Sequence, residues 1–203
     1  MNGQEDAMKP ESISLLTICG LGELDRHRVH GVSHVLSILD PGSPEPPEFR
    51  AYDPHCRTTL HFHDEIEPGP NHSLPQSEHL AAILAFGRSL AQDVHVDRKL
   101  HLLVHCHMGI SRSTAAMATL LAQIHPEEHE DRIFARVLHL RPQAWPNCLM
   151  IRLADEMLER GGRLTAALGR LYAVHLRKTP ELGRYMRENG RAREVDMAEG
   201  RSD

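Results

Sequence analysis

The amino-acid sequence predicts an α/β domain, and three observations indicate this class. Short β-like runs occupy the first part of the chain, helical periodicity dominates the later part, and one strongly apolar run, residues 100–104, lies between them. Early strands and later helices around a buried strand are typical of α/β domains. The 203 residues fit one domain whose core folds without disulfides or metal ions.

Three β-like runs precede the apolar one. Residues 13–19 end at a glycine-rich turn, and residues 32–39 stop before a loop with four prolines, residues 41–47. Proline cannot continue a strand, so this segment is expected to be a surface loop. Residues 58–62 lead into an acidic loop rich in proline and glycine, residues 63–70.

Helical spacing of apolar residues predicts five helices further along the chain. They cover a segment from about residue 77 to residue 90, residues 111–124, a segment around 133–138, residues 149–160 and a segment around 164–172. Pro126 closes the second of these helices, and Asn147 can cap the fourth.

The two ends of the chain lack the patterns of a packed core. Residues 1–11 are polar and acidic, so we expect a flexible lead that is not a secretory signal. From Thr179 onward the chain is charged and has no apolar periodicity, which predicts a disordered tail over residues 179–203. A single domain over residues 12–178 remains.

Composition narrows the classes of function. The net charge of −5, with histidine neutral, gives no case for binding nucleic acid or a membrane surface, and no apolar run is long enough to span a bilayer. The cysteines are scattered without a Cys-x-x-Cys pair, which argues against a zinc ribbon or a disulfide scaffold and favours a cytoplasmic protein. They are Cys19, Cys56, Cys106 and Cys148.

The candidate chemistry lies in residues 102–114, where a buried strand delivers Cys106 to a tight loop that runs straight into a helix. Backbone N–H groups at a helix N-terminus are unpaired and attract an anion. Gly109 supplies backbone freedom in the turn, and Arg112 offers a planar fork of donors that matches two phosphate oxygens. We therefore expect a phosphate-binding loop made of His107, Met108, Gly109, Ile110, Ser111 and Arg112.

The same surroundings act on Cys106. The helix dipole, the loop amides and Arg112 all favour the ionised thiolate, which can attack phosphorus and form a phosphocysteine that water hydrolyses. Ser113, or Ser111, can donate a hydrogen bond to the sulfur and ease its departure. The plain alternative is a buried core cysteine with a surface arginine six positions later. That alternative is weakened because the same short stretch contains a strand before the cysteine, a glycine in the loop, a hydroxyl residue after the arginine and an Ala-rich helix.

These residues resemble a known family. His105-Cys106 through Arg112-Ser113 is similar to the signature loop of the protein tyrosine phosphatase superfamily, and the ending Gly-Ile-Ser-Arg-Ser resembles its compact dual-specificity branch. Residues 31–36 are similar to the second strand of that branch, and Arg141-Pro142 followed by Asn147 resembles its Arg-Pro…Pro-Asn turn. The resemblance covers roughly residues 13–160, and the chain as a whole resembles a bacterial protein of this kind.

The resemblance implies a cysteine phosphatase fold, with a central, mostly parallel sheet flanked by helices. It also implies hydrolysis of phosphotyrosine or related monoesters without a metal or other cofactor. The substrate would be a phosphorylated protein or a small phosphomonoester, and His105 would orient the cysteine loop by hydrogen bonding.

Expelling an alcohol or phenolate from phosphorus needs a proton donor, and the family places an aspartate on a mobile loop before the cysteine. Asp64 lies 42 positions before Cys106, at the end of a predicted strand and in a Pro/Gly-rich loop. We therefore predict that Asp64 is the general acid, with Glu65 and Glu67 as the alternatives. The plain interpretation is a solvated loop carboxylate.

Three other functions compete. A zinc hydrolase could use His61-x-His63 with Asp64, but its usual His-x-His-x-Asp-His pattern is broken here by Glu65 and Ile66. A non-catalytic module could use the same fold to bind phosphoproteins, yet a binder needs neither a nucleophile nor an acid. A sulfurtransferase of the rhodanese type also has a cysteine loop, but the acid loop and the Arg-Ser pair fit it poorly.

The substrate is less constrained than the reaction. Lipid and inositide phosphatases of the superfamily tend to carry lysines in the loop, and residues 107–111 contain none. Aromatic residues make up only 4% of the chain, so no tyrosine-bearing loop is expected to clamp a deep phosphotyrosine. We expect a shallow pocket with His107 and Met108 at its rim.

Overall fold

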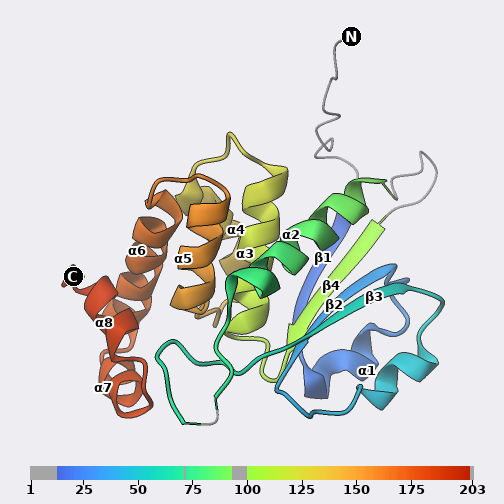
Figure 1. Ribbon diagram of the computed structural model, residues 1–203, viewed down its shortest axis with the longest axis horizontal. Helices are drawn as coiled ribbons and strands as arrows, with labels where there is room; N and C mark the ends of the chain where they lie inside the picture. Colours follow the sequence, from blue (N-terminus) through green and yellow to red (C-terminus); the bar gives the residue numbers. More distant parts are fainter. Residues whose placement is uncertain (1–12, 71, 93–99, 202–203) are drawn as a thin grey trace.

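The computed structural model describes residues 13–70, 72–92 and 100–201, and its centre is a four-stranded parallel sheet (Figure 1). The strand order is β1 (Ile13–Gly20), β4 (Leu100–Cys106), β2 (His34–Leu39) and β3 (Cys56–His61). Every neighbouring pair is parallel, which confirms the α/β class and the parallel sheet. The predicted flexible lead, residues 1–11, lies outside the described residues.

Register brings the strand ends together at one edge of the sheet. Gly20 pairs with Cys106 across β1 and β4, and Ser37 pairs with His105 across β2 and β4. β2 and β4 are buried along their whole length, as their near-continuous apolar sequences predict for the centre of a parallel sheet. Because parallel strands end at the same edge, Cys106 lies beside the chain segments that follow the other strands.

The five predicted helices form, and they cover one face of the sheet (Figure 1). They are α2 (Ser77–Gln92), α3 (Arg112–Ile124), α4 (Glu130–Leu140), α5 (Cys148–Met157) and α6 (Arg163–Lys178). Asn147 caps α5 as predicted, because its side chain accepts a hydrogen bond from the Met150 amide at 3.1 Å. The main hydrophobic core lies between these helices and the sheet.

In the described part of the chain, the opposite face of the sheet carries short elements that the sequence analysis did not predict. They are η1 (Leu21–Glu23), α1 (Leu24–His27) and η2 (Pro47–Ala51). A second, smaller core lies under them, where Leu24 and Phe49 pack against Val35 and Leu103. Because successive strand residues point to opposite faces, His105 faces this smaller core while Cys106 faces the main one.

The prediction of a disordered tail is wrong for residues 179–201. This segment forms α7 (Glu181–Glu188) and α8 (Ala192–Ala198), which pack at the end of α6 (Figure 1). Met186 and Val195 join the main core, and Glu194 is completely buried. Two short helices offer too few apolar residues for a clear periodicity, and their order comes from tertiary packing.

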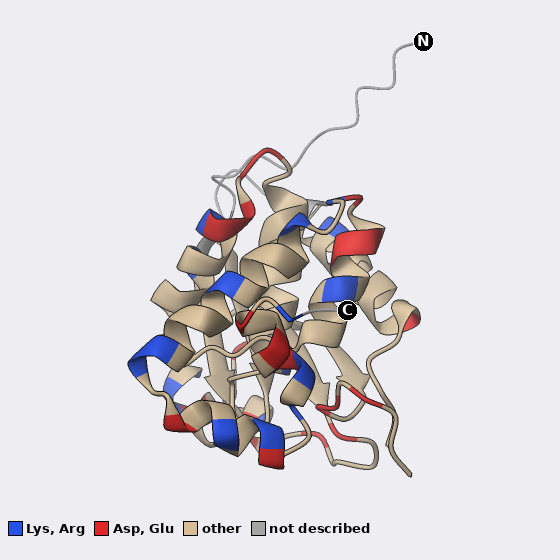
Figure 2. Ribbon diagram, turned by 90° about the vertical axis from the view of Figure 1, so that its left-hand side faces the viewer, with Lys and Arg blue, Asp and Glu red and all other residues tan. Residues whose placement is uncertain are grey.

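Charges are mixed over the molecule. Basic and acidic residues are interspersed along the helices (Figure 2). Among the helices in the described part of the chain, none is long and apolar enough to cross a membrane.

Candidate active site

Cys106 is the last residue of β4 and lies just before the N-terminus of α3. Its sulfur is 3.2 Å from the Ser113 Oγ, on the first turn of that helix, so the predicted hydroxyl partner is Ser113. Burial raises the pKa of two other cysteines, that of Cys19 to about 12 and that of Cys148 well above its ordinary value. Both stay protonated thiols.

The loop after Cys106 is held by its carbonyl groups. Four successive carbonyl oxygens accept hydrogen bonds from groups outside the loop. The donors are the Leu21 amide to His107 at 2.9 Å, Arg141 Nη2 to Met108 at 3.0 Å, Arg141 Nε to Gly109 at 3.1 Å and the Trp145 amide to Ile110 at 2.9 Å. Since a peptide carbonyl and the next N–H point in opposite directions, this bonding turns the loop amides inward.

The inward-facing amides have the arrangement that the predicted phosphate-binding loop requires, and we call this loop the cradle. Among the described residues, the N–H groups of residues 107–111 donate no hydrogen bond, as expected for groups reserved for an anion. α3 begins at Arg112 and directs its positive end at the same place. The loop of residues 107–112 therefore has the shape and polarity of an oxyanion site.

Gly109 makes the turn possible for two reasons. Its φ is +69°, a left-handed conformation that glycine adopts without strain. A Cβ at this position would lie 2.5 Å from the carbonyl carbon of Cys19 and 2.7 Å from the nitrogen of Gly20. The cradle thus packs directly against the backbone at the end of β1.

Arg112 is 3% exposed and fixed at one edge of its guanidinium. Its Nη1 donates to Asp40 Oδ1 and to the carbonyl oxygen of Phe62, both at 2.6 Å. The buried Nε has no partner among the described residues. An unpaired buried donor is costly, so the edge formed by Nε and Nη2 is the edge that an anion with two oxygens would satisfy.

Asp64 follows β3 and its carboxylate is bound through one oxygen. Oδ1 accepts from Ser111 Oγ at 2.6 Å, Asn147 Nδ2 at 2.9 Å and Arg191 Nη1 at 3.2 Å. Oδ2 accepts no hydrogen bond from the described residues, and a third of the side chain (33%) is exposed. The structure therefore places Asp64 beside the cysteine loop with one oxygen free.

The charge state of Asp64 follows from these contacts. Burial by itself raises the pKa of Asp64, but the positive charge of Arg191 and the hydrogen bonds from Ser111 and Asn147 outweigh it. The pKa of the carboxyl is held below its ordinary value, so Asp64 is ionised at neutral pH while the site is empty.

Known proteins with this architecture are found by structure and not by sequence. No protein-family model and no curated protein sequence matches the chain. The solved PTP-2 phosphatase of Cydia pomonella has a TM-score of 0.53 at 22% identity, over 70% of this chain and 85% of that one. Human DUSP28 gives 0.52 at 16% identity, over 71% and 92% of the two chains. DUSP15 gives 0.51 at 19% identity, over 77% and 92%.

The chain has the cysteine phosphatase fold. At these identities the likeness concerns the fold, and the chemistry has to come from the residues of this chain.

His105 lies behind the cradle of this phosphatase fold. It is fully buried, its Nε2 is 2.7 Å from the Ser37 Oγ on β2, and its ring packs against Phe49. Burial lowers the pKa of His105 to about 4, so the imidazole is neutral at neutral pH. The side chain ties β4 to β2 just before Cys106, a geometry that suits the orienting role proposed from the sequence.

The alternative acids and the metal ligands are not assembled at the site. Glu65 pairs with His72 at 3.3 Å, and Glu67 is exposed. His61 is exposed at the end of β3, and the Nδ1 of His63 accepts from the Ser73 amide at 3.0 Å. Within the described part of the chain, no group of three or more His, Cys, Asp or Glu residues is arranged to hold a metal ion.

Sequence reasoning missed several residues that shape the site. Asp40 follows β2 at the same sheet edge as Cys106, and this topological position is a signal that could have found it. Arg141 was noted only for its resemblance to a family turn, yet it holds two loop carbonyls and pairs with Glu23. No sequence pattern marked Arg191 as a site residue, because it lies in the segment that was predicted to be disordered.

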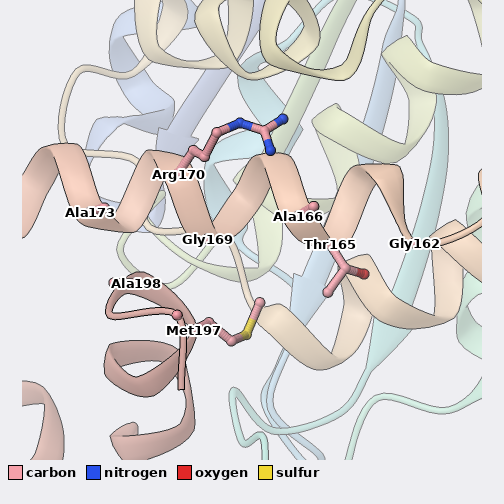
Figure 3. Close-up of a pocket in the computed structure, with 9 residues that line it drawn as sticks. Gly162, Thr165, Ala166, Gly169, Arg170, Ala173, Met197 and Ala198 are labelled. Atoms are coloured by element: carbon pink, nitrogen blue, oxygen red, sulfur yellow. The ribbon is translucent and has the colours of Figure 1, made fainter. Parts of the chain in front are cut away.

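A cavity lies elsewhere on the molecule. This hollow of about 530 Å³ lies between α6 and α8 and is lined by small residues such as Gly169 and Ala173 together with Met197. These residues are labelled in Figure 3. None of its lining residues belongs to the cysteine loop or to the segment that carries Asp64. It forms no part of the candidate active site.

Gly109→Ala should displace the cradle, because the new Cβ meets backbone atoms that cannot move aside. We expect the affinity for inorganic vanadate, a phosphate-like oxyanion, to fall roughly 100-fold, the scale for a shift of about 1 Å in a binding group. Titration with vanadate measures this. Gly31→Ala is the matched control, since Gly31 also has a positive φ (+62°) but nothing within 4 Å of its Cβ position. Equal vanadate affinity in both variants would contradict the cradle geometry.

His105→Gln should make stability less sensitive to acid. The folded-state pKa of about 4 lies below the ordinary 6.5, so between these values the unfolded chain binds a proton that the folded chain does not. Stability is therefore lost as pH falls, by about 2 kcal/mol between pH 7 and pH 5 from this group. Urea unfolding at both pH values should show this loss reduced in His105→Gln and retained in His61→Gln, whose side chain is exposed. Identical losses in the two variants would refute the assignment.

Proposed function

We propose that this protein is a cysteine-dependent phosphatase that hydrolyses phosphate monoesters through a phosphocysteine intermediate. One observation carries the proposal: the loop carbonyls of residues 107–110 are all bound from outside, so the inward amides surround the position in front of Cys106. Arg112 Nε and Asp64 Oδ2, which have no hydrogen-bond partner among the described residues, support it. The structural likeness to tyrosine and dual-specificity phosphatases supports the same reaction class.

The first step transfers the phosphoryl group to sulfur. The loop amides and the Nε/Nη2 edge of Arg112 bind the phosphate oxygens and hold phosphorus in line with the Cys106 sulfur. The thiolate forms the S–P bond while the bond from phosphorus to the leaving oxygen breaks. Asp64, protonated on its free Oδ2, gives its proton to that oxygen, so the alcohol or phenol departs neutral.

The second step releases phosphate. Asp64, now a carboxylate, accepts a proton from a water molecule as that water attacks phosphorus. The S–P bond breaks and the electron pair returns to the Cys106 sulfur. The Ser113 hydroxyl, 3.2 Å away, donates to the departing thiolate and lowers the cost of its negative charge.

The protonation state of Asp64 agrees with this order of reaction steps. In the empty site the pKa of Asp64 is held below its ordinary value. A phosphate monoester brings close to two negative charges beside the carboxylate, and a nearby like charge raises a carboxyl pKa. Binding of the substrate thus favours the protonated acid that the first step needs.

The substrates that we propose are phosphotyrosine-, phosphoserine- or phosphothreonine-bearing proteins and small phosphomonoesters. Met108 is 67% exposed and His107 is half exposed, so both lie at the rim, where they would touch groups that flank the phosphate. The reaction as proposed uses no cofactor.

Cys106→Ser should lower turnover of p-nitrophenyl phosphate by at least about 1,000-fold, because the serine hydroxyl is a far weaker nucleophile in this cradle. Vanadate binding should persist. Cys56→Ser, at an exposed cysteine, is the control and should keep wild-type turnover. Near wild-type activity in Cys106→Ser would refute the proposed nucleophile. A correctly folded wild-type protein that binds vanadate without any turnover would instead indicate a phosphoprotein-binding module.

Asp64→Asn should slow hydrolysis of phenyl phosphate, which has a poor leaving group, by about 100-fold. The loss should be much smaller with p-nitrophenyl phosphate, whose leaving group departs without a proton. Steady-state rates with both substrates give the ratio. Glu67→Gln and Glu65→Gln are the controls, because these were the alternative acids. If one of them shows the substrate-dependent loss and Asp64→Asn does not, the acid has been misassigned.

A further inference from the structure

A buried ion pair in the C-terminal segment reaches the candidate active site. Arg191 caps the start of α8 and Glu194 lies on its first turn, and both are buried. Arg191 donates to Glu194 twice, from Nε and from Nη2, each at 2.8 Å. We call this pair the C-terminal clasp.

Glu194 fixes the clasp to the body of the domain. Its two carboxylate oxygens also accept from Trp145 Nε1 at 2.5 Å, the Cys148 amide at 3.0 Å and the Tyr172 hydroxyl at 3.1 Å. These donors come from the turn before α5, from α5 itself and from α6. A carboxylate with this many donors has one orientation, and it sets the orientation of Arg191.

Arg191 uses its remaining donor positions on the two catalytic segments. Nη1 donates to the Asp64 carboxylate at 3.2 Å and to the Asp64 carbonyl at 3.1 Å. Nη2 also lies 3.1 Å from Ser111 Oγ, in the cysteine loop. A single guanidinium therefore contacts the acid-bearing segment after β3, the cysteine loop and α8.

We propose that Arg191 is a positioning residue that fixes the general acid: the C-terminal clasp holds Oδ1 of Asp64 so that Oδ2 faces the phosphate site. The inference rests on the proposed phosphatase function and deepens it. The segment that begins at Thr179 thereby becomes part of the catalytic unit.

The physical argument concerns specificity more than stability. A buried ion pair stabilises a fold no better than well-packed apolar residues of similar size, so its effect is to define one arrangement. Asp64 lies in a loop, where a carboxylate would otherwise sample several rotamers. With Oδ1 bound by Arg191, Ser111 and Asn147, only Oδ2 remains to meet the leaving oxygen.

The charges around Asp64 give the clasp a second, measurable effect. Two cations act on this carboxylate, Arg191 before α8 and Arg112 on α3. Ser111 and Asn147 are neutral donors, and on the same loop Glu65 is paired with His72. Removing the charge of Arg191 favours the protonated acid, so the basic limb of the pH–rate profile, which reports loss of the acid proton, should move to higher pH.

Two variants separate position from charge. Arg191→Lys keeps a cation but cannot bind Glu194, Asp64 and Ser111 together. Arg191→Gln combined with Glu194→Gln removes both charges of the clasp, so neither of its two members is left as an unpaired buried charge. Arg187→Gln is the matched control, because Arg187 pairs with Asp196 and Glu199 within the same C-terminal segment and does not contact the site.

The readout is the ratio of kcat/KM for p-nitrophenyl phosphate to that for phenyl phosphate. In both clasp variants this ratio should rise roughly 10- to 100-fold, the scale for a misplaced catalytic group, and Arg187→Gln should keep the wild-type ratio. The basic limb should move to higher pH in the Gln/Gln variant and stay near its wild-type position in Arg191→Lys. Added to Asp64→Asn, Arg191→Lys should cause no further change in the ratio.

Two measurements show whether a clasp variant has merely lost its fold. Trp145, the one tryptophan of the chain, donates to Glu194 and stacks on Tyr172 at 4.4 Å, so its fluorescence follows unfolding of this region. Vanadate affinity should stay within about threefold of wild type in Arg191→Lys, because Arg141, Trp145 and Leu21 still hold the cradle.

The outcomes that would overturn the inference are distinct. If Asp64→Asn changes the substrate ratio and the folded clasp variants do not, the clasp does not position the acid. A further change when Arg191→Lys is added to Asp64→Asn would show that Arg191 acts elsewhere. If Asp64→Asn itself leaves the ratio unchanged, the general acid of the proposed function is wrong, and the inference falls with it.

Discussion

The candidate site depends on the direction in which one loop turns its peptide groups. The carbonyl oxygens of residues 107–110 are bound by Leu21, which follows β1, and by Arg141 and Trp145, which lie in the turn between α4 and α5. The bonding leaves the amide hydrogens facing the position in front of the sulfur. A preorganised set of dipoles of this kind binds a phosphate and its transition state without rearranging, which is why electrostatic stabilisation is commonly the largest catalytic contribution.

Two arginines serve this site by the same physical device. Arg112 is anchored at Nη1 by Asp40, and its Nε has no partner among the described residues. Arg191 is anchored by Glu194, and its remaining donors reach Asp64. In each case a carboxylate fixes one edge of a rigid, planar guanidinium, so that the other edge is presented in one orientation. The anchor therefore sets the orientation of the guanidinium edge that is proposed to meet the substrate or the general acid.

The C-terminal helices connect fold stability with the site. Met186 and Val195 contribute to the main core, so α7 and α8 are held by the same packing that holds α6. Arg191 links these packed helices to the segment after β3, because it donates a hydrogen bond to Asp64, 127 positions earlier in the sequence. A loop that bears an acid needs freedom to admit substrate and a defined position to donate a proton. A clasp through one guanidinium is compatible with both needs.

The sequence by itself determined the fold class, the strand that ends at Cys106 and the residues proposed to bind phosphate, because these features are local. Apolar runs, a glycine in a tight turn and a helix start are all read within a few positions of one another. Only the tertiary structure decided three contacts: Arg112 donates to Asp40, Arg141 donates to the loop carbonyls, and Arg191 donates to Asp64. Such contacts join residues far apart in the chain, and no local pattern encodes them. The helices of residues 179–201 were not predicted from the sequence, because short helices form through tertiary packing and not through their own apolar periodicity.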